Sequence, residues 1–484
     1  MRVVHVASEV APFAQTGGLA DAVTGMSAAL AESHGLQVGV MVPLYRGVEG
    51  KLAAAGHALS AGYAITINVG PHHVPAAVRT ARIGRVTYGF LDCPPLYDRA
   101  GTLYGPGGTA DFGDNHLRFA ALGKAAHEHG GALVGGAMDV MHVHDWQGAP
   151  GAIYSRLASS SFAIVATIHN LAFRGIFPKH TMDDLGIPWS WFDLHHAEFY
   201  DQLSLLKGGL AAADAVTTVS PTYAREILTP ERGEALDAFL RWDVRRLIGI
   251  VNGIEVRAWD PATDPVLPAN FSSTSLAGKA TCRTAVAQEF GLPLADHEPL
   301  IAVIARMAGQ KGLDLVADAI PDLHRLGAKL VVLGSGEPDL EARFRWLADV
   351  FRDHVAVRIG FDLKMSRRLY AGSDLFVMPS RFEPCGLGQM YAMRYGSMPV
   401  VHAVGGLRDT VLDPGDEDLA RGIGTGIRFD EPTVTALVRA LERAVALYRD
   451  PIALANIRRA VMARDSSWTA SAQQYLQLYR SLRT

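Results

Sequence analysis

Polar and glycine-rich residues follow apolar, strand-like runs at several places in this chain. The clearest case is Pro379–Gly396, PSRFEPCGLGQMYAMRYG, which comes after the apolar run Leu375–Met378 and leads into a helical pattern near Leu387. Glu383 therefore lies in a loop between a strand and a helix. Ligands bind at this end of the strands in open α/β sheets, and a helix N-terminus favours an anion there. A carboxylate beside an anion site indicates a hydroxyl-rich group joined to a phosphate, such as a nucleotide sugar; a surface Glu at an ordinary junction is the alternative.

Two cations lie five residues apart in another loop of this kind. Arg306 and Lys311 follow the apolar run Leu300–Ile304 in the sequence ARMAGQKG. An arginine offers a planar fork of donors to phosphate oxygens, and a lysine offers a movable point charge. The two side chains can therefore face one anionic ligand, although solvated loop charges are the simpler interpretation of this segment alone. A Gly-Gly pair at Gly405–Gly406 precedes a further helical pattern.

The first half of the chain carries polar loops of the same type. Gln15–Asp21, QTGGLAD, follows the first strand-like run and precedes a helical pattern. Its two glycines permit a tight turn and the approach of a phosphate to backbone N–H groups. Asp145 and Trp146 end the segment HVHDW, where a carboxylate and an indole suit sugar hydroxyls and stacking. His169 follows another strand-like run, and a satisfied core histidine is its alternative role.

A metal site is not expected in this chain. His142 and His144 are two residues apart on one strand-like run, and no third ligand set lies near them in the sequence. A structural or catalytic zinc site needs three or four ligands. The spacing therefore predicts no metal site.

Length and composition favour a large globular protein with two domains. The chain has 484 residues, 49% hydrophobic and 19% charged, with a net charge of −4. No basic block indicates nucleic acid, and no apolar run is long enough for a membrane span. The cysteines, Cys93, Cys282 and Cys385, are too widely spaced for a metal cluster or a disulfide framework. We expect a cytoplasmic protein of unknown oligomeric state.

Apolar strand-like runs alternate with helical patterns along most of the chain, which predicts parallel sheets built from βαβ units. We expect an α/β protein with two Rossmann-like domains. The predicted domains are residues 1–248, residues 249–462 and a C-terminal helix in residues 463–484 that returns to the first domain. The polar loops are divided between the two halves, and this distribution predicts a site in a cleft between two facing domains.

The motifs QTGGLADAV, HVHDWQ, TIHNLAFRG, KGGLAAADAVTTVSPTYAREI, VNGIE, ARMAGQKG, PSRFEPCGLGQ and GGLRDTV occur in this order. Together they resemble bacterial glycogen synthases and plant starch synthases over essentially the whole chain. The resemblance implies the GT-B glycosyltransferase fold. It also implies transfer of glucose from ADP-glucose to the non-reducing 4-OH of an α-1,4-glucan, either glycogen or a maltooligosaccharide, with retention of configuration. The resemblance further implies that no organic cofactor is needed.

The resemblance assigns roles to individual residues. His169, Glu383, Arg306 and Lys311 match the catalytic positions, with His169 beside the transferred sugar and the two cations holding the diphosphate. The positions that match substrate-binding residues of the family are Gln15, Gly17, Gly18, Asp21, Asp145, Trp146, Asn170, Asn252, Phe361, Cys385, Gly386 and Leu387.

Some positions depart from the family pattern. Gln15 occupies a position where the family usually has lysine, Phe361 stands at the adenine position, and Gln147 and Gly388 replace a common histidine and a common hydroxyl residue. A neutral amide cannot offset charge, so a paralogous glucosyltransferase with UDP-glucose as donor or a short oligosaccharide as acceptor remains an alternative. A non-catalytic glucan-binding regulator is the alternative from a different class.

Overall fold

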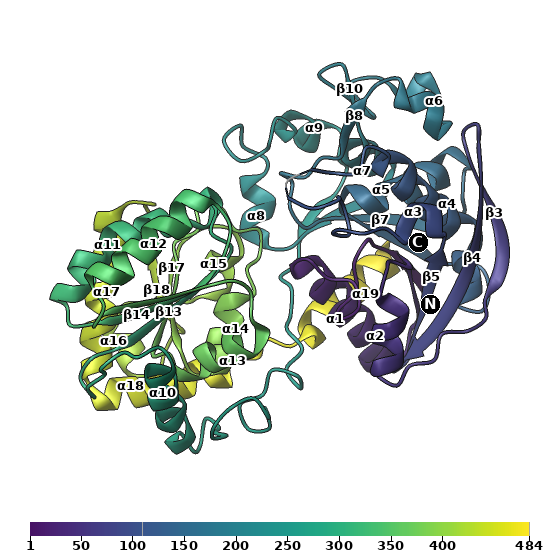
Figure 1. Ribbon diagram of the computed structural model, residues 1–484. Coiled ribbons are helices and arrows are strands. Elements are labelled where there is room, and N and C mark those ends of the chain that lie inside the picture. Colours follow the sequence, from purple (N-terminus) through teal and green to yellow (C-terminus); the bar gives the residue numbers. More distant parts are fainter. Residues whose placement is uncertain (109, 484) are drawn as a thin grey trace. The chain divides into compact units, whose positions relative to one another are not determined.

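The computed structural model describes residues 1–108 and 110–483, which form two compact units. The first unit contains Met1–Gly253 together with the chain from Trp468 onward, and the second contains Ile254–Ser467. Each unit is built around its own sheet, mainly parallel in the first unit and wholly parallel in the second, with helices on both faces (Figure 1). Among the described residues, no helix is long and apolar enough to cross a membrane.

The first unit has a nine-stranded sheet in the order β12-β11-β7-β6-β1-β2-β5-β4-β3. Most neighbours are parallel, but β4 is antiparallel to both β3 and β5, an addition that the sequence patterns did not predict. The central strands are buried on both faces, which fits their mainly apolar sequences, although they also carry the buried polar residues His5, His142, His144 and Thr167. The strands are β1 (Arg2–Val6), β2 (Gln37–Pro43), β3 (Tyr63–Val69), β4 (His72–Ile83), β5 (Val86–Asp92), β6 (Val140–His144), β7 (Ala163–Ile168), β11 (Ala215–Thr218) and β12 (Leu247–Gly249).

Helices and one small sheet complete the first unit. The antiparallel sheet contains β8 (Ile176–Pro178), β10 (Gln202–Ser204) and β9 (Glu198–Phe199). The helices are α1 (Gly18–His34), α2 (Val48–Ala54), α3 (Pro94–Tyr97), α4 (Asn115–Leu133), α5 (Asp145–Leu157), α6 (Thr181–Leu185), the 3-10 turn η1 (Trp189–Trp191), α7 (Leu205–Ala212), α8 (Pro221–Glu226), α9 (Asp237–Trp242) and α19 (Trp468–Ser481).

The last helix, α19, packs against α1 although the two are at opposite ends of the sequence (Figure 1). A Cβ atom on Gly25 of α1 would lie 2.0 Å from Nε1 of Trp468, so only glycine lets this indole pack there. On the same helix, Tyr479 is buried and its hydroxyl lies 2.6 Å from Nδ1 of His142. The start of α19 therefore depends on a missing side chain in α1, and its end is joined to β6.

The unit boundaries lie slightly beyond the predicted positions 248 and 462. Ile250 N donates to Thr218 O at 2.8 Å, and Ser471 Oγ donates to Val251 O at 2.5 Å. These bonds keep the segment after β12 on the first unit. Ile254 then pairs with Ser467 as an isolated bridge, where the chain enters and leaves the second unit.

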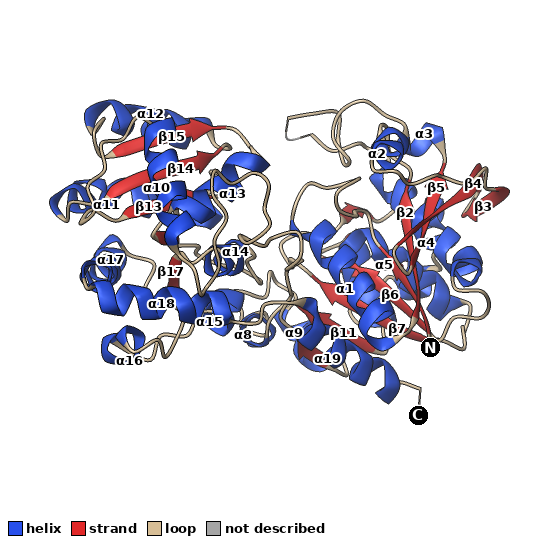
Figure 2. Ribbon diagram, turned by 90° about the horizontal axis from the view of Figure 1, so that it is seen from below, coloured by secondary structure: helices blue, strands red, loops and turns tan. Residues whose placement is uncertain are grey.

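The second unit has a six-stranded parallel sheet in the order β15-β14-β13-β16-β17-β18 (Figure 2). This is the 3-2-1-4-5-6 order of the Rossmann fold. Helices α11, α12 and α17 pack together, and α10, α13, α14 and α18 form a second group. The strands are β13 (Leu300–Ile304), β14 (Lys329–Gly334), β15 (Val355–Ile359), β16 (Leu375–Met378), β17 (Met398–His402) and β18 (Ile427–Phe429).

Local signals in the sequence explain where several helices of this unit begin. The side chain of Asp362 accepts from Met365 N at the start of α13, and Thr433 does the same for Ala436 N at the start of α17. The helices are α10 (Ala277–Glu289), the 3-10 turn η2 (Gly309–Lys311), α11 (Leu313–Arg325), α12 (Pro338–Val350), α13 (Leu363–Gly372), α14 (Gly388–Arg394), α15 (Gly405–Thr410), α16 (Asp416–Ala420), α17 (Val434–Arg449) and α18 (Pro451–Ala463).

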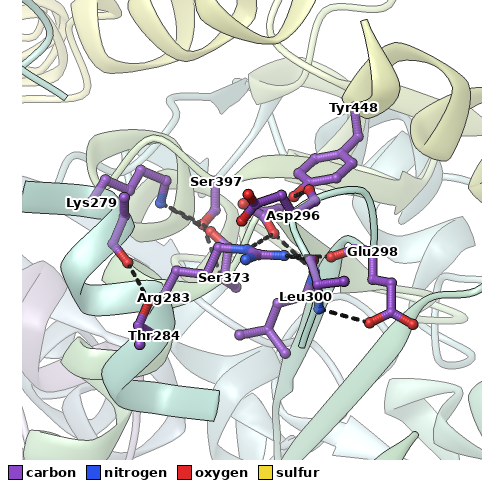
Figure 3. Close-up of polar contacts among 12 residues, drawn as sticks. Lys279, Arg283, Thr284, Asp296, Glu298, Leu300, Ser373, Ser397 and Tyr448 are labelled. Atoms are coloured by element: carbon purple, nitrogen blue, oxygen red, sulfur yellow. Dashed lines mark hydrogen bonds and ion pairs between the residues drawn. The ribbon is translucent and has the colours of Figure 1, made fainter. Parts of the chain in front are cut away.

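A buried ionic network joins α10 to the sheet (Figure 3). Nζ of Lys279 donates to the carbonyls of Ala371, Ser373 and Tyr395 at 2.8–2.9 Å, which are at the ends of α13 and α14. The neighbouring Asp374 carboxylate accepts from Arg283 Nε at 3.0 Å and from the backbone N–H that begins β13 at 2.9 Å. Because Asp374 immediately precedes β16, this carboxylate aligns the starts of two adjacent central strands.

We predict that Lys279→Met destabilises the second unit. Lys279 is 2% exposed, and its removal leaves the buried carbonyls of Ala371 and Tyr395 without their donor, whereas Ser373 O keeps its bond from Ser397 Oγ. A buried polar group without a partner costs about 1–3 kcal/mol, so we expect a loss of about 3 kcal/mol in unfolding free energy. Urea unfolding measures this loss. Lys364→Met on the exposed surface of α13 is the control and should change little; equal stability of the two variants would contradict the assigned role.

Candidate functional site

The strand order of the second unit reverses direction between β13 and β16. In sheets of this type, ligands bind outside the carboxyl ends of the strands at such a switch point. The loop with Arg306 and Lys311 follows β13, and the loop with Glu383 follows β16. The structure therefore brings two of the sequence-predicted loops to the place where the topology favours a ligand.

The two loops meet through an ion pair. Nζ of Lys311 lies 2.6 Å from Oε2 of Glu383, which also accepts from Ser380 Oγ at 3.0 Å. Glu383 is 6% exposed, while Lys311 is partly open to solvent. Gly312 has a φ of +65°, and a Cβ atom there would lie 2.2 Å from the carbonyl oxygen of Pro379. Glycine therefore permits the close approach that places Lys311 beside Glu383.

Arg381, a residue that the sequence analysis did not select, joins the same two loops through separate contacts. Its guanidinium binds both carboxylate oxygens of Asp314 at 2.6 and 2.7 Å and donates to Gly309 O at 2.8 Å. Its backbone N–H donates to Gln310 O at 2.9 Å. This bidentate pair raises the pKa of Arg381 and lowers that of Asp314. These contacts therefore hold the two loops together independently of the Lys311–Glu383 ion pair.

The second glycine pair of the sequence is a packing device. A Cβ atom on Gly405 would lie 2.0 Å from Glu383 O, and one on Gly406 would lie 2.1 Å from Cys385 O. The loop after β16 thus rests directly on the backbone of α15. Gln389 Nε2 donates to Cys385 O at 3.1 Å and to the carbonyl of Gly386 at 2.9 Å. These contacts fix the segment that carries Glu383, Cys385 and Gly386, and Leu387 directly precedes α14.

Two other predicted residues of this unit are exposed. Arg306 contacts the side chain of Gln310 at 3.4 Å and is otherwise open to solvent. Phe361 follows β15 and its side chain is 84% exposed. A large aromatic ring that is left in water at the carboxyl edge of a sheet has a free face for stacking. The structure therefore leaves a cation and an aromatic face available beside the ion-paired loops.

The first unit has its own strand reversal, between β1 and β6. The loop with Gln15, Gly17 and Gly18 follows β1, and Asp145 directly follows β6. His169 follows β7, the neighbour of β6. The sequence-predicted residues of the first half thus lie at the carboxyl ends of three adjacent strands.

Glu9, which the sequence analysis missed, organises the glycine loop. Its buried carboxylate accepts from Thr16 N at 2.7 Å, from Thr16 Oγ1 at 2.6 Å and from the hydroxyl of Tyr104 at 2.5 Å. The signal was an acid inside the apolar run VHVASEVAP. Gly17 has an extended backbone, and a Cβ atom there would meet nothing within 4 Å. Neither conformation nor packing within this unit requires glycine at position 17.

The side chain of Gln15 is held by a specific hydrogen bond. Its Nε2 donates to the carboxylate of Asp21 at 2.8 Å. Burial raises the pKa of Asp21 to about 6, the Gln15 hydrogen bond opposes this shift, and the charge of Glu9 adds to it. The glycine loop therefore carries an acidic, partly desolvated group at Asp21, and the neutral amide of Gln15 places no positive charge beside it.

Asp145 is in a strained and buried position. Its φ is +52°, a backbone conformation that residues other than glycine rarely adopt. Its carboxylate accepts from His169 N at 2.7 Å. Burial raises its pKa to about 7, and the hydrogen bond from His169 N opposes this shift. The strain and the desolvated carboxylate both indicate a functional position.

Two of the predicted residues of this unit, Trp146 and Asn252, are largely enclosed, and Asn170 is half-buried. Trp146 is 8% exposed and packs between the rings of Phe119 and Phe177. The indole is therefore part of the core, and the structure does not show the open stacking face that we expected. Asn252 is 7% exposed, and the half-buried Asn170 accepts from Ala172 N at 3.1 Å.

A row of histidines lies across the three strands. Nε2 of His169 is 3.0 Å from Nδ1 of His144, whose Nε2 is 3.0 Å from Nδ1 of His5. The pairing of β1 with β6 sets His5 opposite His142. The sequence analysis did not include this third histidine, because it is distant from the other two along the chain. His5, His142 and His144 have ring nitrogens within 4.8 Å of one another. Both ring nitrogens of His142 are hydrogen-bonded, to Tyr479 and Thr167. We therefore interpret His5, His142 and His144 as a hydrogen-bonded cluster and not as a set of metal ligands.

Comparisons with known proteins identify the kind of protein. A family model described as the starch synthase catalytic domain matches residues 2–242, and one described as glycosyl transferases group 1 matches residues 298–446. The glycogen synthase of Anaeromyxobacter dehalogenans strain 2CP-C is 46% identical over 488 residues, which covers 100% of both chains. Glycogen synthase 1 of Rhizobium meliloti is 41% identical and covers 100% of this chain and 99% of its own.

Solved structures give the same result. The catalytic domain of starch synthase IV from Arabidopsis thaliana, bound to ADP and acarbose, has a TM-score of 0.88 and 32% identity, covering 100% of this chain and 99% of that one. Sucrose-phosphate synthase from Thermosynechococcus elongatus, at 19% identity and a TM-score of 0.58, shares the fold.

Two Rossmann-like units with ligand-type loops at both strand reversals, together with these matches, define a glycosyltransferase enzyme. Within that class, the chain belongs to the family of bacterial glycogen synthases and plant starch synthases. The resemblance and the two-domain α/β fold predicted from the sequence are confirmed.

We predict that Asp145→Asn makes the protein more stable, and increasingly so as pH rises. The folded-state pKa of Asp145 is about 7, against an ordinary value of 3.8, so its stabilising contribution is present below 3.8 and is lost as pH rises through 7. The advantage of the variant should grow by about 1.4 kcal/mol per pH unit in this window.

Urea unfolding at pH 5, 6, 7 and 8 measures the difference between the variant and the wild type. Asparagine still accepts from His169 N, so the fold should persist. Asp349→Asn, at an exposed position on α12, is the control. A constant difference across the four pH values would show that the Asp145 carboxylate is not desolvated.

Proposed function

We propose that this chain is a glycogen synthase. It transfers glucose from ADP-glucose to the non-reducing 4-OH of an α-1,4-glucan with retention of configuration. The observation that carries the proposal is the Lys311–Glu383 pair at the switch point of the second sheet, in a chain 46% identical to a curated glycogen synthase. The relative bound to ADP and acarbose supports a nucleoside diphosphate donor and a glucan acceptor.

The chemistry of the second unit suits departure of a nucleoside diphosphate. The bond between the anomeric carbon and the β-phosphate oxygen breaks, and negative charge develops on that phosphate. Lys311 and Arg306 stabilise this charge, while Glu383 accepts from hydroxyls of the donor glucose. Phe361 provides the stacking face for adenine. The acceptor 4-OH forms the new bond to the same face of the anomeric carbon, and its proton passes to the leaving phosphate oxygen.

The first unit contributes the remaining groups. His169 and Asp145 bind the transferred sugar and the acceptor, and Asn170, Asn252 and the edge of Trp146 lie around them. The open position of Gly17 is explained by a ligand, because nothing within the unit requires glycine there. Backbone N–H groups at the start of α1 receive the phosphates. No metal is required, because Lys311 and Arg306 supply the positive charge.

We place the reaction in the cytoplasm. Cys93, Cys282 and Cys385 form no disulfide, which fits a reducing compartment. This location also gives access to a nucleotide sugar.

We predict that Glu383→Gln and Lys311→Met each lower turnover at least about a hundredfold, because each removes a group that acts at the reacting centre. The assay measures ADP released from ADP-glucose in the presence of glycogen. Glu383→Gln keeps a hydrogen-bond partner for Ser380, and the Arg381–Asp314 pair still holds the loops, so folding should be preserved.

Asp349→Asn removes an exposed charge near the end of α12, away from the loops after β13 and β16, and serves as the control. A wild-type protein that releases no ADP with glycogen would refute the proposed function. A Glu383→Gln variant with near-full activity would refute the assigned site alone.

The second candidate function is the same transfer from UDP-glucose, and Gln15 favours it. The amide is bound to Asp21 and places no positive charge beside the phosphates. A regulator without activity is disfavoured, because all four residues matched to catalysis are present. Parallel assays with ADP-glucose and UDP-glucose decide between the two donors.

We predict that Gln15→Lys raises activity on ADP-glucose by up to about tenfold, which corresponds to 1.4 kcal/mol. An ammonium group near the glycine loop attracts the phosphates. The carboxylate of Asp21, which Gln15 contacts in the structure, would offset part of that positive charge. Gln15→Glu, of nearly the same size, is the matched opposite and should lower activity. If Gln15→Lys lowers the rate on both donors, the site is adapted to the amide and the electrostatic argument fails.

A further inference from the structure

The histidine row of the first unit contains a chain of hydrogen bonds that ends at His169. From His5 on β1 the contacts run to His144 on β6 and then to His169 after β7, each 3.0 Å long. His5 and His144 are fully buried, whereas His169 is half-buried. Nδ1 of His169 makes no hydrogen bond among the described residues and is not enclosed, so it is the end of the chain that a ligand can reach.

All three rings are neutral at physiological pH. Burial lowers the pKa of His5 and of His169 to about 3, and it lowers that of His144 well below its ordinary value, with further lowering by the neighbouring histidines. A neutral imidazole has one N–H donor and one acceptor nitrogen. His144 makes two ring hydrogen bonds, so it donates in one and accepts in the other. The chain must therefore donate in one direction throughout.

Only two directions exist, and they leave different atoms without a partner. If donation runs from His5 to His169, Nε2 of His5 is an unpaired acceptor. If it runs from His169 to His5, the same Nε2 carries an unpaired N–H. That atom is buried and lacks a partner among the described residues. Buried N–H groups without acceptors are the rarer and more costly case.

We propose that His5 and His144 are positioning residues that fix the tautomer of His169, so that its Nδ1 carries the proton and donates to an oxygen of the bound sugar. Nε2 of His169 then accepts from His144 Nδ1–H, and Nε2 of His144 accepts from His5 Nδ1–H. His169 is thus a neutral donor at every pH at which the enzyme works. The inference rests on the proposed function in assigning a sugar oxygen as the acceptor.

Other groups packed around the row support a neutral chain. The ring of His142 stacks on His144 at 4.4 Å and is itself held by Thr167 and by Tyr479 of α19. Tyr475 of the same helix also contacts His142. The acids nearby are Asp145, whose carboxylate binds the backbone N–H of His169 rather than its ring, and Glu9, which is held by Thr16 and Tyr104.

The first test is the tautomer itself. Long-range ¹H–¹⁵N spectra of the histidine-labelled wild-type protein, without substrate, distinguish a protonated Nδ1 from a protonated Nε2. The His169 signals are assigned by their loss in His169→Gln. We expect Nδ1 of His169 to be protonated, with no change between pH 6 and 9. A proton on Nε2 would overturn the proposal. Because no substrate is present, this result does not depend on the proposed function.

The second test uses the matched pair of variants His144→Asn and His144→Asp. The two new side chains have the same shape, but the amide can donate to His169 Nε2 whereas an ionised carboxylate can only accept. With ADP-glucose and glycogen, we expect His144→Asn to retain activity within about tenfold of wild type. We expect His144→Asp to lose at least about a hundredfold at pH 8, the range found when one positioned donor is lost.

The pH profile separates positioning from a general structural effect. A carboxylate beside His169 raises the pKa of the ring. His144→Asp should therefore be most active at low pH and lose about tenfold per pH unit above the new pKa, whereas wild type and His144→Asn show no such limb. Equal rates and equal pH profiles for the Asn and Asp variants would overturn the proposal, and if neither variant folds, the wild-type spectra decide it.

Discussion

The close approach of two backbone loops in the second unit is the constraint on which the rest of that unit's site depends. Gly312 lies against the carbonyl of Pro379, and this contact leaves no room for a side chain. It brings Lys311 within 2.6 Å of Glu383. The approach is possible because β13 and β16 are adjacent in the sheet, and Asp374 aligns the starts of these strands by accepting from Leu300 N. A single carboxylate at one end of the strands thus supports an ion pair at the other end.

The two units solve the same problem with different chemistry. In the second unit, cations and carboxylates pair directly, and the loops are held by charge-assisted bonds such as Arg381–Asp314. In the first unit, the supporting groups are neutral histidines and a buried Glu9 that binds hydroxyl and backbone donors. A unit that neutralises a diphosphate needs fixed positive charge. Under the function that we propose, the first unit binds sugar hydroxyls, which need donors and acceptors of defined direction, and neutral rings supply these.

The strand–loop–helix junctions were predictable from the sequence because each has a local signature. Runs such as Leu300–Ile304 and Leu375–Met378 are apolar throughout, and the structure has β13 and β16 with these bounds. The supporting residues were not predictable, because their partners are distant in the sequence. His5 meets His144 across 139 residues, and Arg381 meets Asp314 across 67. Trp146 shows the converse, since a local motif cannot reveal that Phe119 and Phe177 enclose the indole.

The first unit is discontinuous in the sequence, and this has a consequence for its synthesis. Residues up to Gly253 leave the ribosome before the second unit, but α19, which packs on α1 and meets His142 through Tyr479, is made after it. The whole second unit is translated in between, and domains generally fold as units as they emerge. Until α19 emerges, the first unit is therefore incomplete, and the surface of α1 that binds α19 and the ring of His142 stay uncovered. The protein's two halves are thus completed in the reverse of the order in which they are begun.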